Sequence, residues 1–312
     1  MDVSPASSLA TQAPAATLDW LCSEENPAVA ALTLRGLLGD TGSPRAEEMW
    51  ARRNAYEPVN TILGQMRPDG SWDTPGRDYQ KYGGNLWQVH FLGELFADGD
   101  DERVRTAASY AFSRQLPDGS WSCNGRVSAA IPCLTANVSR ALARLGFARD
   151  ERIARALGYC VSLYDAFGCL TCGTPERDGQ PPAEWGASTS TLNGYCHMLA
   201  PKLLLFLAEV PRDVWPQGTE RLRNECVRVL REKEIFRSLP GEPARPEYAP
   251  ALAAVRSAAD SEMRWKLRNS FNGKMRADVE VKGEPSRWVT WRALTVLQHY
   301  GSANDAVPEN VS

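Results

Sequence analysis

A repeat with a period of 49 residues constrains the fold of this chain more than any other feature. The segment QMRPDGSW, which ends at Trp72, recurs as QLPDGSW, which ends at Trp121. A second motif recurs with the same offset, as DERV from Asp101 and DERI from Asp150. One offset shared by two separate motifs indicates a repeated structural unit.

Each unit has the pattern of a helical hairpin. Apolar residues follow helical spacing over 104–115, and the Pro-Asp-Gly that begins at Pro117 ends that helix. A second helix is expected over 133–145, with Gly146 as its stop. We expect further helices over 18–38, 44–66, 85–96, 151–164, 196–210 and 288–300, and no segment alternates as a strand does. Repeated helical hairpins predict an all-α chain that stacks as an open solenoid or closes into a ring.

Composition predicts a globular domain and excludes some partners. Of the 312 residues, 43% are hydrophobic and 23% charged, which is typical of a globular protein. We expect one domain over 17–302, with disordered tails over 1–16 and 303–312. The net charge of −3 leaves no basic surplus for nucleic acid. The longest apolar stretch, 199–210, is too short for a membrane span, and 1–16 lacks a signal-peptide pattern, so cytoplasmic residence is expected.

The repeated turns carry a family resemblance. They resemble the units that link outer to inner helices in squalene–hopene cyclases and in protein prenyltransferase β-subunits. Nearly the whole chain is similar to bacterial proteins labelled prenyltransferase/squalene oxidase repeat proteins, through stretches such as KYGGNLWQVHFLGEL, IPCLTANVSRALARLG and CHMLAPKLLLFLAEVP. The resemblance implies an α/α toroid of the terpenoid-cyclase and prenyltransferase kind. The short distance between Glu247 and Trp265 leaves little room for one further inner helix of that family, so we expect a toroid that is incomplete on one side.

The carboxylates do not predict a class II cyclase. The run from Asp98 to Asp101 (DGDD) matches the D-x-D-D acid motif of those enzymes, but it follows a helix where the family's acid opens an inner one. Asp101 is better explained as a helix N-cap. The expected inner-helix starts, near 84–87, 133–135, 196–198 and 288–290, carry no carboxylate in their first turn, and no Asp-rich magnesium motif is evident.

Cysteines, by contrast, gather near those helix starts. The chain has eight, which a reducing compartment keeps as thiols. Those at Cys22, Cys160 and Cys226 lie in apolar helical patterns and are expected in the core. Those at Cys133 and Cys196 fall at matching places on successive inner helices, where the positive end of the helix dipole favours a thiolate.

Zinc, which takes four ligands from such thiolates and imidazoles, is therefore a candidate cofactor. The first ligands expected are Cys133, Cys172 and Cys196, with Cys123 or His197 as the fourth, or with an open position for substrate. The resemblance points the same way. Prenyltransferase β-subunits hold a catalytic zinc on this rim, and lanthipeptide cyclases use a Cys-His pair that Cys196-His197 resembles without its usual glycine. The alternative is that small cysteines simply pack at crowded helix starts.

Four residues near the same rim are expected to bind substrate. Aromatic rings at Tyr82, Trp87 and Trp288 suit an apolar pocket or a cation, and Arg287 suits an anion. The three repeat tryptophans are expected to pack the repeats, as Trp72, Trp121 and Trp265. The two remaining histidines, His90 and His299, are expected in the core.

Three functions remain open at this point, and the sequence singles out no catalytic residue. The first is an enzyme acting on a hydrophobic, isoprenoid-like or thiol-containing small molecule, with zinc. The second is a non-catalytic toroid that binds a hydrophobic ligand or a protein. The third is a toroid whose zinc is purely structural.

Overall fold

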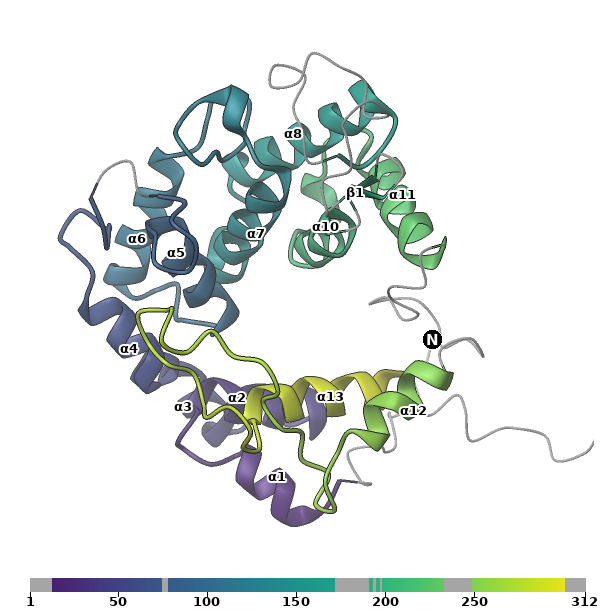
Figure 1. Ribbon diagram of the computed structural model, residues 1–312. Coiled ribbons are helices and arrows are strands. Elements are labelled where there is room, and N and C mark those ends of the chain that lie inside the picture. The colour runs from purple at the N-terminus through teal and green to yellow at the C-terminus, as the bar shows by residue number, and fades with distance from the viewer. Residues whose placement is uncertain are drawn as a thin grey trace, which may run out of the picture. The chain divides into compact units, whose positions relative to one another are not determined.

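The computed structural model describes residues 13–74, 78–171, 191–192, 195–196, 198–232 and 249–300 (Figure 1). Their secondary structure is helical apart from two short antiparallel strands, β1 (Thr191–Leu192) and β2 (Tyr195–Cys196), which confirms the all-α class. No helix in these residues is long and apolar enough to span a membrane. The chain divides into two compact units. Unit 1 comprises Met1–Pro58, Arg237–Gly273 and Ala277–Ser312, and unit 2 comprises Val59–Phe236 and Lys274–Arg276. The single domain expected over 17–302 stays a prediction.

Unit 2 contains two layers of helices. The first layer holds α5 (Asn85–Glu94), α7 (Pro132–Leu142) and α10 (Leu199–Leu207), with α7 packed between the other two (Figure 1). The second layer holds α6 (Glu102–Ser113), α8 (Glu151–Phe167) and α11 (Thr219–Glu232), each packed on the first-layer helix that precedes it in the chain. The short helices η3 (Val127–Ala129), η4 (Ala143–Phe147) and η6 (Arg212–Val214) lie between them in sequence. The hairpins predicted from the repeat are therefore present.

Unit 1 is built from both ends of the chain. The N-terminal part forms α1 (Ala15–Leu21), α2 (Pro27–Leu32), η1 (Thr33–Leu37), α3 (Pro44–Ala51) and η2 (Arg53–Ala55), and α4 (Glu57–Gly64) leads into unit 2. The C-terminal part forms α12 (Ala249–Ser257) and α13 (Arg287–Tyr300). Helix α13 packs against α2, η1 and α12, and the Gln298 amide donates to the Leu37 carbonyl at 3.2 Å.

A buried tryptophan ties two helices together at each repeat turn. Each indole N–H donates to a backbone carbonyl ten residues earlier, in the preceding helix, and each backbone N–H donates to a side chain in the first turn of the next helix. The indole bonds are Trp72 to Ile62 (2.6 Å), Trp121 to Ala111 (2.9 Å) and Trp265 to Val255 (2.7 Å). The backbone bonds are Trp72 to Asn85 (2.7 Å), Trp121 to Thr135 (3.0 Å) and Trp265 to Thr290 (2.9 Å). The expected packing role of these tryptophans is confirmed.

The Asp-Gly-Ser residues before the first two tryptophans shape the turn. The carboxylate of Asp118 accepts from the backbone N–H and the hydroxyl of Ser120, at 2.9 and 2.7 Å. Gly119 has a φ of +93°, and a Cβ there would lie 2.4 Å from the Arg155 carbonyl oxygen of α8. The glycine is therefore needed both for its backbone conformation and for close approach to the next second-layer helix. The first turn is built the same way.

A third turn has the same backbone without the Asp-Gly-Ser sequence. Met263 takes the place of the glycine with a φ of +56°, and its N–H donates to the Asp260 carbonyl at 3.0 Å, as Gly119 donates to Leu116 at 2.9 Å. A non-glycine residue in this region costs about 1–2 kcal/mol. Trp265 was expected to pack a repeat, but the Asp-Gly-Ser motif is absent here, so packing holds this turn without its preferred residues.

Helix α1 occupies, beside the third turn, the place that the next second-layer helix occupies beside the first two. The Thr17 hydroxyl donates to the Glu262 carbonyl at 2.6 Å, and the Arg264 guanidinium lies 4.7 Å from the centre of the Trp20 ring. Among the described residues of unit 1, the last repeat turn therefore packs on the first helix, α1.

Several expected boundaries were wrong. The expected helix over 18–38 is two helices, because Asn26 caps a new one through its bond from the Val29 N–H (3.1 Å) and Pro27 begins it. The expected helix over 44–66 is interrupted at η2, and α11 and α12 were not expected. Helix α1 begins at Ala15, inside the expected tail over 1–16. Residues 303–312 lie outside the described part.

The expected loss of an inner helix stays a prediction. Between Glu247 and Trp265 the chain forms α12, which relates to Trp265 as α4 relates to Trp72. The segment between α11 and α12 covers 233–248, which the structure does not describe.

We predict that Gly119→Ala is much more destabilising than Gly146→Ala. Both glycines have positive φ, +93° and +98°, but a Cβ on Gly146 would meet nothing within 4 Å. The Gly146 variant should lose about 1–2 kcal/mol from backbone strain alone. The Gly119 variant should lose about 1–3 kcal/mol more, because it also collides with the backbone of α8. Urea unfolding of both variants measures the difference, and equal losses would contradict the close packing of this turn.

Candidate functional site

The sulfur atoms of Cys133 and Cys196 lie 3.9 Å apart in unit 2. Cys133 is the second residue of α7 and is partly exposed, whereas Cys196 is fully buried in strand β2. The separation exceeds the roughly 2.05 Å of a disulfide bond. Residues 63 positions apart in the chain are thus brought together.

The position of Cys133 follows from the repeat turn. The backbone N–H of Ile131 donates to the Trp121 carbonyl at 3.0 Å, and the Thr135 hydroxyl accepts from the Trp121 N–H. Pro132 occupies the first position of α7, where its missing N–H costs nothing. The start of α7, and Cys133 with it, is therefore held by the buried tryptophan.

The position of Cys196 differs from the one expected. Helix α10 begins at Leu199, so Cys196 lies before the helix and not in its first turn. Its backbone N–H donates to the Leu170 carbonyl at 2.7 Å, which holds β2 beside the residues that follow α8. The positive end of a helix dipole therefore favours a thiolate at Cys133 and not at Cys196.

The other expected ligands do not complete a site in the residues that the structure describes. Cys172 and His197 lie outside them. Cys123 is partly exposed, and its thiol approaches the Ala129 carbonyl at 3.8 Å. Within the described ranges no three or more His, Cys, Asp or Glu side chains are close enough to hold a metal ion.

A phenol lies beside this region. Burial raises the pKa of Tyr79, Lys81 lowers it, and the Cys123 and Cys133 thiols raise it further. Tyr79 thus lies within electrostatic reach of both thiols, a neighbour that the sequence pattern did not indicate.

Other cysteines are packing residues. Burial raises the pKa of the Cys22 thiol to about 11 and that of Cys160 to about 12, and it also raises the pKa of Cys226. The expected core placement of these three is confirmed. Cys160 and Cys169 face an apolar gap too tight for a water molecule, so the gap is not a ligand site.

We predict that native-state alkylation at about pH 8 modifies Cys123 and spares the core thiols, because only the thiolate reacts. Cys22, Cys160 and Cys226 should react only after denaturation. Peptide mass spectrometry locates the label. Rapid native labelling of Cys160 would show that its surroundings open far more easily than its burial implies.

The expected substrate-binding residues lie in both units. In unit 2, the Tyr82 and Trp87 rings are 5.3 Å apart, and the Lys81 ammonium lies 5.2 Å from the Tyr82 ring. Tyr82 has a φ of +67°, held in part by the Gln88 amide, which donates to its carbonyl at 2.9 Å.

In unit 1, Arg287 is engaged by the N-terminal segment. Its guanidinium pairs with Glu25, donates to the Trp20 carbonyl at 3.3 Å and lies 4.8 Å from the centre of the Trp20 ring. Trp288 is buried and packs edge-on against Tyr56 at 6.4 Å. Arg287 therefore already serves to hold α1, and its expected role toward an anionic ligand stays a prediction.

The Asp98–Asp101 run caps a helix, as expected. Asp101 is the N-cap of α6 and accepts from the Arg103 N–H at 2.8 Å, and Asp150 caps α8 through the Arg152 N–H at the same distance. Asp100 pairs with Arg105 at 2.6 Å. These contacts favour the structural explanation of the D-x-D-D match.

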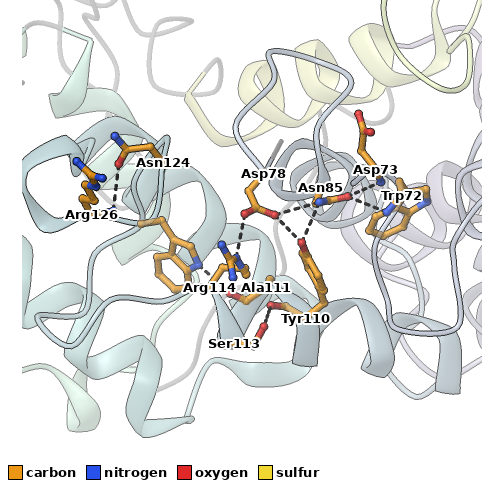
Figure 2. A network of polar contacts seen from close by, with 11 residues as sticks. Trp72, Asp73, Asp78, Asn85, Tyr110, Ala111, Ser113, Arg114, Asn124 and Arg126 are labelled. Atoms are coloured by element: carbon orange, nitrogen blue, oxygen red, sulfur yellow. Dashed lines mark hydrogen bonds and ion pairs between the residues drawn. The ribbon is translucent and has the colours of Figure 1, made fainter. Parts of the chain in front are cut away.

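A buried carboxylate that the sequence analysis missed lies beside the start of α5 (Figure 2). Asp78 accepts from the Tyr110 hydroxyl at 2.6 Å, the Asn85 amide at 3.0 Å and the Arg114 guanidinium at 2.9 Å. Burial raises the pKa of Tyr110, and Asp78 raises it further. Because both carboxylate oxygens already have donors, Asp78 serves to anchor its loop to α6.

A second loop carboxylate lies at the start of α13. Glu280 accepts from the Arg287 N–H at 2.7 Å and from the Ser286 hydroxyl, and Ser286 in turn accepts from the Val289 N–H at 3.0 Å. The first turns of α5, α7, α10 and α13 contain no acid themselves, as expected. At α5 and at α13, a carboxylate from the preceding loop lies beside the start of the helix. Only the tertiary structure shows this placement.

The two expected core histidines differ. His299 is exposed, which corrects the prediction, because its position on α13 faces away from the packed side. His90 on α5 has a lowered pKa. Burial is the main cause, Glu94 opposes it, and Arg140 and Lys202 add to it.

We predict that His90 makes the folded state less stable in acid. Its pKa is lower folded than in the unfolded chain, where it is about 6.5. The unfolded state therefore binds more protons as the pH falls below that value, so the free energy of unfolding decreases there and is fully recovered above it. Urea unfolding of wild type and His90→Gln between about pH 5 and 8 checks this. An identical pH dependence in both would contradict it.

Comparisons with known proteins identify no relative: no family model matches the chain, and no curated protein is significantly similar to it.

Proposed function

We propose that this chain is an α/α-toroid enzyme that uses zinc to act on a hydrophobic, isoprenoid-like or thiol-containing small molecule, as its resemblance to terpenoid cyclases and prenyltransferases implies. The observation that carries the proposal is the 3.9 Å separation of the Cys133 and Cys196 sulfur atoms. The fold brings the two sulfur atoms together, and a shared zinc ion would explain why they lie so close.

The unit 1 contacts support ring closure. Three turns of the same construction join α4 to α5, α6 to α7 and α12 to α13. The first turn packs against α6, and the second packs against α8. For the third turn, that neighbour is α1, through Thr17 and Trp20. A closed toroid is the arrangement of such repeats in which the last meets the first.

The donor set fits zinc. Two thiolates bound to one tetrahedral zinc, each at about 2.3 Å, have sulfur atoms about 3.8 Å apart. Cys133 and Cys196 would be two ligands, with Cys172 and His197 as further candidates by sequence. When bound, zinc would supply Lewis acidity, or would lower the pKa of a coordinated thiol.

The protein's own groups have separate roles in this proposal. The N-terminal end of α7 stabilises the thiolate form of Cys133, and the buried β2 segment keeps Cys196 from solvent. Tyr79 lies within electrostatic reach of Cys133, and its hydroxyl stays protonated near neutral pH because burial raises its pKa. The aromatic pair of Tyr82 and Trp87 offers an apolar surface to a substrate.

A structural zinc is the second candidate. Full burial of Cys196 and its bond to Leu170 suit a closed site that joins the start of α7 to the segment before α10. Such a site would have four protein ligands and no open position.

We predict about one zinc per chain in untagged protein, with the metal lost in both Cys133→Ser and Cys196→Ser. Elemental analysis measures it. Cys22→Ala is the control, since that thiol is buried in unit 1 and its loss should leave the zinc content unchanged. A metal-free wild type would refute the proposal and leave a non-catalytic binding role as the better account.

Cobalt(II) in place of zinc separates the two candidates. An open coordination position predicts that an added small thiol changes the cobalt absorption spectrum. A closed structural site predicts an unchanged spectrum together with unfolding on chelation.

A further inference from the structure

Two polar atoms on one face of α5 are buried without a hydrogen-bond partner among the described residues. They are the indole nitrogen of Trp87 and Nδ1 of His90, three residues apart and hence on the same side of the helix. Their rings meet edge-to-face with centres 5.6 Å apart. Parts of both side chains reach the surface, so the pair borders solvent although the nitrogen atoms do not contact it.

The protonation state of His90 follows from its neighbours. Burial lowers its pKa. Glu94 and the Asn137 backbone oppose this, Arg140 and Lys202 add to it, and the net shift is downward, so the ring is neutral near neutral pH. The Asn137 backbone hydrogen-bonds the ring, and because Nδ1 has no partner this bond uses Nε2. The single ring proton is therefore on Nε2, and Nδ1 presents a lone pair.

The arginines and glutamates nearby pair with one another. Arg140 on α7 pairs with Glu94 on α5, and Arg144 on η4 pairs with Glu209, which follows α10, at 2.6 Å. These groups do not supply the partner that Trp87 and His90 lack.

A donor and an acceptor on one face of the helix favour a ligand group that can both accept and donate. The indole N–H can only donate, and the neutral Nδ1 can only accept. A carbonyl, an ether or a carboxylate would satisfy the indole and leave the imidazole lone pair without a proton. A hydroxyl group satisfies both, because its oxygen accepts while its proton is donated.

We propose that Trp87 and His90 bind the hydroxyl group of a hydrophobic small molecule. The rings of Tyr82 and Phe91, with centres 5.3 and 5.9 Å from that of Trp87, provide the apolar surface beside it. The inference rests on the proposed function for the hydrophobic character of the ligand, and it adds the polar group that the ligand carries.

The test uses the full chain, labelled with nitrogen-15 in the tryptophan indoles, and two probes. Geraniol carries a hydroxyl, and geranyl methyl ether has an oxygen that accepts but cannot donate. Geraniol should shift the indole N–H resonance of Trp87, which is assigned by its loss in Trp87→Phe. The ether should bind about five- to tenfold more weakly, since one buried hydrogen bond is missing.

Two variants of the same residue sharpen the result. His90→Gln keeps an amide that reaches the Asn137 backbone and removes the acceptor at Nδ1, so the preference for geraniol over the ether should disappear. His90→Asn places an amide oxygen near Nδ1 and should retain part of the preference. Trp291→Phe, on α13 in unit 1, is the control and should change neither affinity.

No binding of geraniol, or equal binding of both probes to wild type, would overturn the inference, and neither result depends on a variant folding. The zinc measurement stays independent of this outcome. One zinc per chain with no hydroxyl preference would leave the proposed function standing alone. A hydroxyl preference in a metal-free protein would leave the binding site without the zinc enzyme.

Discussion

The hydrogen bond from each repeat tryptophan to the carbonyl ten residues earlier is the interaction on which the rest of the structure depends. The indole is fully buried or nearly so, and a buried donor without its acceptor costs about 1–3 kcal/mol. Loss of a buried tryptophan side chain costs about 3–5 kcal/mol in packing. Because the backbone N–H of the same residue bonds to the start of the next helix, one tryptophan sets the relation between two helices.

The candidate site is a consequence of that constraint. Trp121 holds Thr135 and Ile131, and these hold the first turn of α7, where Cys133 lies. Cys196 arrives by a different route, through a short strand bonded to Leu170. The two thiols therefore meet because Trp121 holds the start of α7 and Leu170, which follows α8, holds the strand that carries Cys196. They meet although they lie far apart in the sequence.

The charged side chains of Asp78, Glu280 and Arg287, near the helix starts, are hydrogen-bonded or paired with other groups of the protein. Asp78 has three donors, and Glu280 caps α13 through the Arg287 and Ser286 donors. The Arg287 guanidinium holds the N-terminal segment. An acid or base with such partners is poorly placed for proton transfer. What this leaves for chemistry in the described residues is the thiol pair, the nearby Tyr79 and the Trp87–His90 face.

The sequence alone determined the hairpin repeat, the packing role of the tryptophans and the capping by Asp101. These follow from local rules: helical periodicity, the φ > 0 turn at Gly119 and N-cap chemistry act within one or two turns of chain. Only the tertiary structure decided where Asp78 and Glu280 lie, that Arg287 engages α1, and that Met263 keeps a turn with no glycine. Those facts depend on contacts between segments far apart in the chain, and no local pattern encodes which distant side chain will satisfy a buried polar atom.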